Sequence, residues 1–110
     1  MIQRYAFYLV GHKDKLEAFH NKAKLTHDKF NDLVERHKKG ENVSKHELQK
    51  AFNKATFVAA IQVALVTIME QMQLLKFKST DEFSSEQKKN LMKKCEQDIK
   101  KYFKENRKQQ

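Results

Sequence analysis

The chain has few residues that break helices or form covalent cross-links. Its 110 residues include no Pro, two Gly and a single Cys, Cys95. Because tight turns between strands depend on Gly and Pro, this shortage argues against an all-β fold. A lone Cys cannot form an intramolecular disulfide, which excludes a small secreted fold stapled by disulfides. We therefore expect an all-α protein of the reducing cytoplasm.

Long apolar runs are also scarce. The longest one, residues 55–69, is interrupted by Thr56, Gln62 and Thr67 and is shorter than the roughly 20 residues that span a bilayer. The apolar stretch near the N-terminus is too short for a signal peptide and lacks a small-residue cleavage pattern. We expect no export signal and no membrane span, and we interpret residues 55–69 as part of a buried helix in a single domain, 1–110.

An apolar repeat of seven positions dominates the first third of the chain. It comprises Ile2, Leu9, Leu16, Ala23 and Phe30, with Tyr5, Phe19 and Leu33 at the second seam position. This spacing predicts one long coiled-coil-like helix over residues 2–39, ended by Gly40. The alternative is a break at Gly11, with Asp14 as the N-cap of a second helix, which would give four helical elements.

Two further helices have recognisable starts. Ser44 followed by Glu47, and Ser84 followed by Gln87, have the spacing of capping boxes. They predict helices over residues 44–76 and 84–106, with a frayed tail over 107–110. Three helices joined by two short connections predict an antiparallel, up-down-up three-helix bundle.

Signatures of catalysis are missing from the pattern of reactive side chains. None of the five His forms an i, i+4 pair with another, and no Gly-rich phosphate loop is present. Cys95 lies in the apolar stripe of the third predicted helix, which favours a small core residue over a reactive thiol. We therefore predict a non-enzyme without metal, cofactor or small-molecule substrate.

Positive charge is abundant. Lys and Arg total 23 against 14 Asp and Glu, which gives a formal net charge of +9. The basic rows lie on the first predicted helix at Lys15, Lys22, Lys29 and Arg36, and on the third at Lys88, Lys89, Lys93, Lys94, Lys100, Lys101 and Lys104. These cations are either phosphate contacts or solvated surface charges, which on the first helix would flank a bundle seam. Since almost all are Lys, contact with a phosphate backbone is favoured over reading of bases.

The first ten residues have more apolar side chains than one helix seam can cover. A protein interface that includes Arg4 would cover the surplus, and the alternative is packing against the Phe77–Phe83 segment. The predicted interface residues are Ile2, Arg4, Tyr5, Phe7, Tyr8 and Val10.

Two hypotheses of function follow. The first is a non-enzymatic helical module, an adaptor, inhibitor or regulator, that binds a protein partner and forms a homodimer through its N-terminal end. The alternative is a nonspecific nucleic-acid-binding protein that uses the Lys-rich third helix. The Lys-rich, Pro-free composition is typical of proteins from AT-rich bacterial or phage genomes.

Overall fold

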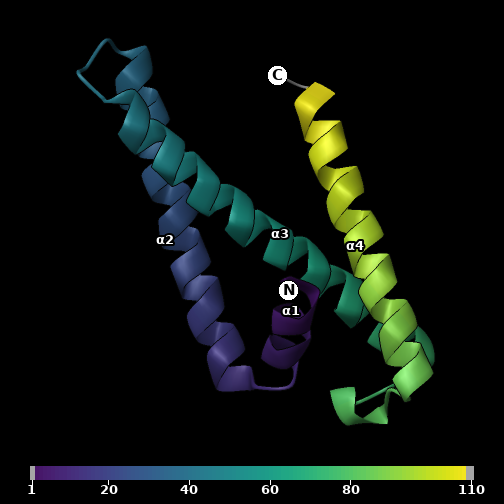
Figure 1. The fold of residues 1–110 in the computed structure, drawn as a ribbon. Coiled ribbons are helices and arrows are strands. Elements are labelled where there is room, and N and C mark those ends of the chain that lie inside the picture. Colours follow the sequence, from purple (N-terminus) through teal and green to yellow (C-terminus); the bar gives the residue numbers. More distant parts are fainter. Residues whose placement is uncertain (1, 109–110) are drawn as a thin grey trace. The chain divides into compact units, whose positions relative to one another are not determined.

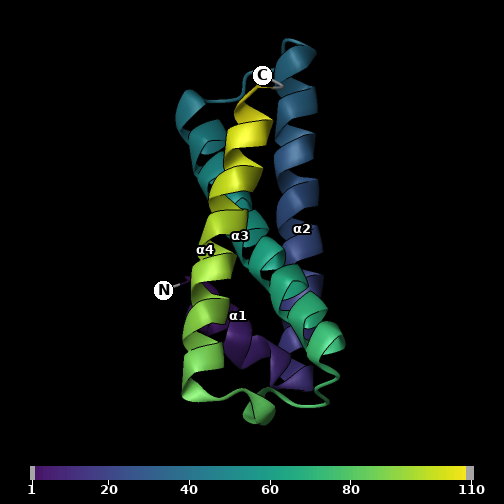
Figure 2. The same ribbon diagram turned by 90° about the vertical axis from the view of Figure 1, so that its right-hand side faces the viewer.

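The computed structural model describes residues 2–108, and the side chains of residues 2–105. Its elements are α1 (Ile2–Val10), α2 (Lys13–Lys38), α3 (Lys45–Leu75), the short 3₁₀ helix η1 (Thr80–Glu82) and α4 (Ser85–Lys108) (Figures 1 and 2). Within this described range the chain forms no strand. The predicted all-α class is confirmed.

The single helix predicted over residues 2–39 is wrong, because the chain breaks at Gly11 as the alternative expected. The backbone N–H groups of Gly11 and His12 donate to the carbonyl oxygens of Tyr8 and Leu9, at 3.1 and 3.0 Å. Glycine fits this break because a Cβ at position 11 would lie 3.0 Å from Oγ1 of Thr80. Asp14 is in the first turn of α2 rather than at its N-cap.

The predicted starts of α3 and α4 are confirmed. The Ser44 hydroxyl accepts a hydrogen bond from the backbone N–H of Glu47 at 3.0 Å. At α4 the capping box is complete, because Ser84 and Gln87 exchange side-chain to backbone bonds of 2.9 and 3.1 Å. α4 continues to Lys108, two residues beyond its predicted end at residue 106. Fraying of the tail stays a prediction, and residues 109 and 110 lie outside the described part.

Two helices end in the same hydrogen-bonded motif, with a left-handed residue just after the helix. For α2 this residue is Gly40, at φ 82°, and the N–H of Glu41 donates to the carbonyl of Arg36 at 3.0 Å. For α3 it is Lys76, at φ 59°, and the N–H of Phe77 donates to the carbonyl of Met72 at 2.8 Å. Both are Schellman motifs, in which glycine is the favoured residue at the left-handed position.

The chain divides into two compact units. Unit 1 comprises α1, the C-terminal half of α3, η1 and α4, and unit 2 comprises residues 14–59. The domain boundaries and the packing of the helices as one three-helix bundle stay predictions.

Unit 1 has a core of small and branched side chains contributed by three helices. Its buried side chains are Ala6 and Leu9 of α1, Ala60, Ile61, Ala64, Leu65, Thr67 and Ile68 of α3, and Leu91 and Cys95 of α4. Hydrogen bonds join α3 to α4: the Thr67 hydroxyl donates to the Asp98 carboxylate at 2.8 Å, and the Cys95 thiol donates to the Ala64 carbonyl at 3.8 Å. The core position predicted for Cys95 is confirmed.

Unit 2 is an antiparallel hairpin of α2 and the N-terminal half of α3 (Figure 1). Its buried side chains are Phe19, Ala23 and Leu33 of α2, and Ala55 and Val58 of α3. The rings of Phe30 and Phe52 also meet across the hairpin, with centroids 5.7 Å apart. The residues of α2 predicted to form an apolar seam are thus buried or half-buried.

The helix α3 is long and apolar enough, by length and composition, to cross a membrane. In the structure 44% of its most apolar window is buried within the protein. The core helix of a soluble protein has the same length and composition, so this property does not by itself indicate a membrane span.

The two left-handed positions generate a paired prediction. Gly40→Ala adds a Cβ at positive φ and should lower the free energy of unfolding by about 1 kcal/mol. Lys76→Gly removes that strain and should raise the same free energy by up to about 1 kcal/mol. Urea unfolding followed by circular dichroism measures both, and shifts of the same sign in the two variants would contradict the assignment.

Burial of Cys95 generates a prediction about pH. Loss of solvation, followed by the nearby Asp98 charge, raises the pKa of the Cys95 thiol from 9.0 to about 11. The folded state therefore holds the thiol proton more tightly than the unfolded state does, and this stabilising contribution is lost as the pH rises from 9 towards 11. Urea unfolding over this range should show wild type losing stability relative to Cys95→Ala, and equal losses in the two proteins would disprove the linkage.

Candidate functional site

A cleft in unit 1 brings together α1, η1 and the first half of α4. We call it the α1–α4 cleft, and its volume is about 1010 Å³. Its lining residues are Gln3, Arg4, Phe7, Tyr8, Gly11, His12, Ser79, Thr80, Asp81, Ser85, Lys88, Lys89, Met92, Lys93 and Glu96. Four cations and two carboxylates are in this set, so the lining is net positive.

A short ladder of aromatic rings runs along α1, and two of its members, Tyr8 and His12, line the cleft. α1 buries Ala6 and Leu9, which leaves Tyr5 and Tyr8 on its outer surface, 46% and 45% exposed. The two Tyr rings stack at a centroid distance of 6.4 Å, and the His12 ring stacks on Tyr8 at 4.2 Å. The His12 Nδ1 is also hydrogen-bonded to the Tyr8 carbonyl oxygen at 2.8 Å. Because α1 ends before His12, this imidazole can turn back over the preceding ring.

A cluster of three phenylalanines holds α1, the helix that carries the ladder, against the segment before α4. Phe83 meets Phe7 edge-on at 5.8 Å and Phe77 at 4.9 Å, measured between ring centroids. Phe83 lies between η1 and α4, so this cluster ties α1 to the connection that precedes α4. Lys88 Nζ lies 4.7 Å from the centroid of the Phe7 ring, within the range of a cation–π contact. The cluster therefore positions an ammonium group beside the aromatic ladder.

The other side of the cleft is a row of cations on α4. Burial of Leu91 and Cys95 fixes the orientation of this helix and leaves Lys88, Lys89 and Lys93 exposed. Farther along, Glu96 forms an ion pair with Lys100 at 3.2 Å, so this carboxylate is partly neutralised at the cleft edge. The arrangement places the partly exposed Tyr8 and His12 rings in the same cleft as ammonium groups that have no ion-pair partner among the described residues.

The residues of the predicted protein interface take two kinds of position. Ile2 and Val10 are half-buried, and Phe7 contacts Phe83, as the alternative of packing against the 77–83 segment expected. Arg4, Tyr5 and Tyr8 are exposed. Much of the predicted apolar surplus is therefore covered by the chain itself, and what remains on the surface is basic and aromatic.

The predicted phosphate contacts are distributed over several surfaces. Lys88, Lys89 and Lys93 line the α1–α4 cleft, whereas Lys22, Lys29 and Arg36 line a groove in unit 2. The remaining predicted contacts lie outside both: Lys15, Lys94, Lys100, Lys101 and Lys104, all exposed. The predicted phosphate contacts therefore do not form one surface, and those in the cleft have different neighbours from those in the groove of unit 2.

Sequence reasoning missed three residues of these sites. His12 was not recognised as a member of the aromatic ladder, although its distance of four residues from Tyr8 is a helical spacing. Lys50 and Lys54 line the groove in unit 2 and have the same i, i+4 spacing. That spacing was the only sequence signal for Lys50 and Lys54, because a groove between two helices can be predicted only when the pairing of the helices is known.

The structure contains no arrangement typical of a metal site in the described residues. Within the part of the chain that the structure describes, no group of three or more His, Cys, Asp or Glu side chains is placed to hold an ion. No Cys and only two carboxylates are among the lining residues of the α1–α4 cleft, and His12 is hydrogen-bonded to the backbone carbonyl oxygen of Tyr8. Its chemistry is that of a binding surface for anions and flat rings.

Comparison with known proteins adds no further constraint. No protein-family model, no curated protein and no solved structure matches this chain.

Proposed function

We propose that the protein is a non-enzymatic binding protein for single-stranded nucleic acid and that the α1–α4 cleft is its binding site. The observation behind this proposal is the proximity of the exposed Tyr8 and His12 rings to Lys88, Lys89 and Lys93 in one cleft. Proteins that bind single strands without sequence preference combine stacking side chains with a positively charged groove along the backbone. The sequence predicted the aromatic residues as a protein interface and the lysines as phosphate contacts. Their proximity in one cleft supports binding of a single strand, because such binding uses both base stacking and phosphate contacts.

A single strand suits this cleft better than a duplex. Bases of a duplex are stacked on each other and present only their edges, so an exposed ring such as Tyr8 finds no π-face there. An unpaired base can continue the ladder of Tyr5, Tyr8 and His12, while the adjoining phosphates contact Lys89 and Lys93. Since the cations are mainly Lys and no side-chain amide other than Gln3 lines the cleft, low sequence specificity is expected.

The stacking contribution can be tested with two substitutions at one position. Tyr8→Ala should weaken binding of a labelled oligo-dT of about 20 nucleotides by roughly tenfold, because base stacking on an aromatic ring contributes about 1–3 kcal/mol. Tyr8→Phe keeps the ring and should bind like wild type. Tyr102→Ala is the matched control, since Tyr102 is similarly exposed, at 39%, but lies outside the α1–α4 cleft.

The ionic contribution is measured in the same fluorescence anisotropy assay. Replacement of Lys89 and Lys93 by Ala should make the slope of log K against log salt concentration shallower by about 1.4, because each contact to a single strand contributes about 0.7. The Lys39→Ala, Lys45→Ala double variant has the same change of charge outside the cleft. Absence of micromolar binding at low salt, or equal affinity of Tyr8→Ala and wild type, would refute the proposal.

Self-association through the N-terminal end is the second candidate. The exposure of Tyr5 and Tyr8 on adjacent turns of α1 favours it, since Tyr is enriched at the centre of protein interfaces. Sedimentation equilibrium at increasing protein concentration should then show a dimer that Tyr5→Ala dissociates. Phe7 is left intact because its contact with Phe83 supports the fold. A monomer at all concentrations, for wild type and variant alike, would eliminate this candidate.

A further inference from the structure

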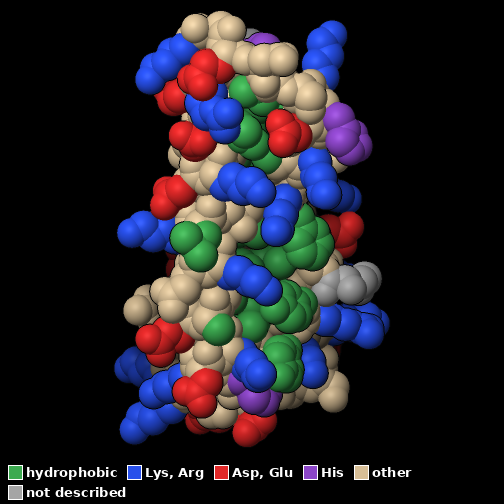
Figure 3. Space-filling model, turned by 90° about the vertical axis from the view of Figure 1, so that its left-hand side faces the viewer, with side chains coloured by type: hydrophobic (Ala, Val, Ile, Leu, Met, Phe, Trp, Pro, Cys, Tyr) green, Lys and Arg blue, Asp and Glu red, His purple; other side chains and the backbone are tan. Residues whose placement is uncertain are grey.

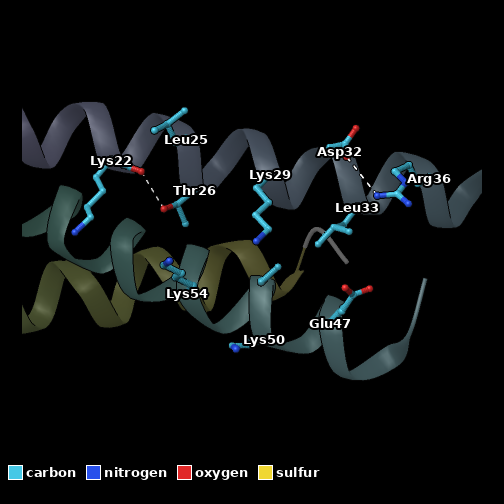
Figure 4. Close-up of a pocket in the computed structure, with 11 residues that line it drawn as sticks. Lys22, Leu25, Thr26, Lys29, Asp32, Leu33, Arg36, Glu47, Lys50 and Lys54 are labelled. Atoms are coloured by element: carbon cyan, nitrogen blue, oxygen red, sulfur yellow. Dashed lines mark hydrogen bonds and ion pairs between the residues drawn. The ribbon is translucent and has the colours of Figure 1, made fainter. Parts of the chain in front are cut away.

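A second groove lies entirely within unit 2, between α2 and the N-terminal half of α3. We call it the hairpin groove, and its volume is about 620 Å³. Its lining residues are Lys22, Leu25, Thr26, Lys29, Asp32, Leu33 and Arg36 of α2, and Glu47, Lys50, Ala51 and Lys54 of α3. Figure 4 shows Lys22 and Lys29 directed from α2 towards α3, with Leu33 between the two helices.

The charge in the hairpin groove is unevenly distributed along its length. Near the turn of the hairpin, Arg36 is 3.9 Å from the Asp32 carboxylate and 3.5 Å from that of Glu41. Asp32 itself points away from α3 in Figure 4. The positive charge near the turn is therefore largely matched by carboxylates of the same unit.

The opposite end of the groove has uncompensated positive charge. Lys22, Lys29, Lys50 and Lys54 have no carboxylate within ion-pair distance among the residues that the structure describes. These four ammonium groups come from both helices, so they surround the groove rather than forming one row. These ammonium groups would favour a ligand whose negative charge lies at this end of the groove.

The groove also has apolar surface that water covers in the free protein. Leu25 is 69% exposed on the outer rim and Ala51 is half-buried, whereas Leu33 belongs to the buried core of the unit. Figure 3 shows a similar mixture on one face of the molecule, where green apolar side chains are surrounded by blue Lys and Arg side chains. No aromatic side chain lines the hairpin groove, which distinguishes it from the α1–α4 cleft.

We infer that the hairpin groove is a docking site for an acidic amphipathic helix of a partner protein. A helix placed along the groove would cover Leu25 and Ala51 with its apolar stripe, and its carboxylates would pair with Lys22, Lys29 and Lys54. Lys22 and Arg36 are fourteen residues apart on α2, a distance of roughly 21 Å or four helical turns. Carboxylates of the partner should cluster at the end of its helix that lies beside Lys22 and Lys54.

Two other occupants fit the observations less well. A phosphate backbone would satisfy the cations, but it offers no apolar counterpart to Leu25 and would find no ring to stack on in this groove. A second copy of this chain fits this groove less well, because its 23 Lys and Arg against 14 Asp and Glu supply few carboxylates to pair with the four ammonium groups. The acidic amphipathic helix is the occupant that complements both the charge and the apolar surface.

The experiment uses the full-length protein and a defined probe. The probe is a capped, fluorescent peptide of about 18 residues, or five helical turns, with a Leu stripe flanked by Glu. A scrambled peptide of identical composition is the control for net charge, and a labelled oligo-dT is the control for phosphate. We expect the amphipathic peptide to bind roughly tenfold more tightly than the scrambled one, because only the former presents a continuous apolar stripe.

Variants then locate the peptide. The triple substitution Lys22→Glu, Lys29→Glu, Lys54→Glu should weaken peptide binding by roughly tenfold or more, whereas Lys24→Glu, Lys39→Glu, Lys45→Glu has the same charge change outside the groove and should have a much smaller effect. Leu25→Ser should weaken peptide binding and leave oligo-dT binding unchanged. Circular dichroism confirms that each variant is helical.

Three results would overturn the inference. They are equal affinity for the amphipathic and scrambled peptides, equal effects of the two triple variants on peptide binding, and loss of oligo-dT binding rather than peptide binding in the groove variant. The last result would assign the groove to phosphate. The first two results concern peptide binding alone and do not depend on the outcome at the α1–α4 cleft, so the two proposals can fail separately.

Discussion

The contact of Phe83 with Phe7 and Phe77 is the interaction on which the α1–α4 cleft depends. These rings are 5.8 and 4.9 Å apart and connect the first helix to the segment before the last one. An aromatic pair in this edge-on geometry contributes about 0.5–1.5 kcal/mol beyond the area that it buries. With α1 held in this way, Lys88 lies over the Phe7 ring and the stacked Tyr8 and His12 rings face the cations of α4.

The chain breaks at Gly11, where a continuous helix over residues 2–39 was predicted, and Gly11 lies close to η1. A Cβ at position 11 would lie 3.0 Å from Oγ1 of Thr80. The seven-residue repeat that predicted the long helix is still reflected in burial, since Leu9, Ala23 and Leu33 are all buried. Periodicity therefore identified which residues face a core. The break at Gly11 was predicted only as an alternative, and its proximity to Thr80, about seventy residues away in sequence, could not be predicted.

Local signals were the most reliable guide to this chain. The capping residues Ser44 and Ser84 marked helix starts because their hydrogen bonds involve partners only three residues away. The sites were predicted only as separate halves, Tyr8 with its neighbours on one helix and Lys88 with its neighbours on another. Their union could not be predicted, because it follows from tertiary contacts of Phe83 and from the burial of Leu91 and Cys95, which fixes the face that α4 presents.

The excess of positive charge thus has different neighbours in the two units. In the α1–α4 cleft, ammonium groups lie beside aromatic rings, and in the hairpin groove they surround aliphatic side chains. Because each environment complements a different ligand, the net charge of +9 does not by itself identify a partner.

If the α1–α4 cleft binds single strands as proposed, unpaired bases stack on the aromatic ladder of α1. Photo-crosslinking with a single-stranded oligonucleotide that contains 5-bromouracil, followed by mass spectrometry, tests it most directly because it identifies the side chains in contact with a base. Our account predicts adducts on Tyr5, Tyr8 or His12 that an unlabelled oligo-dT competes away. Adducts confined to other parts of the chain, or none under conditions in which the oligonucleotide is bound, would contradict it.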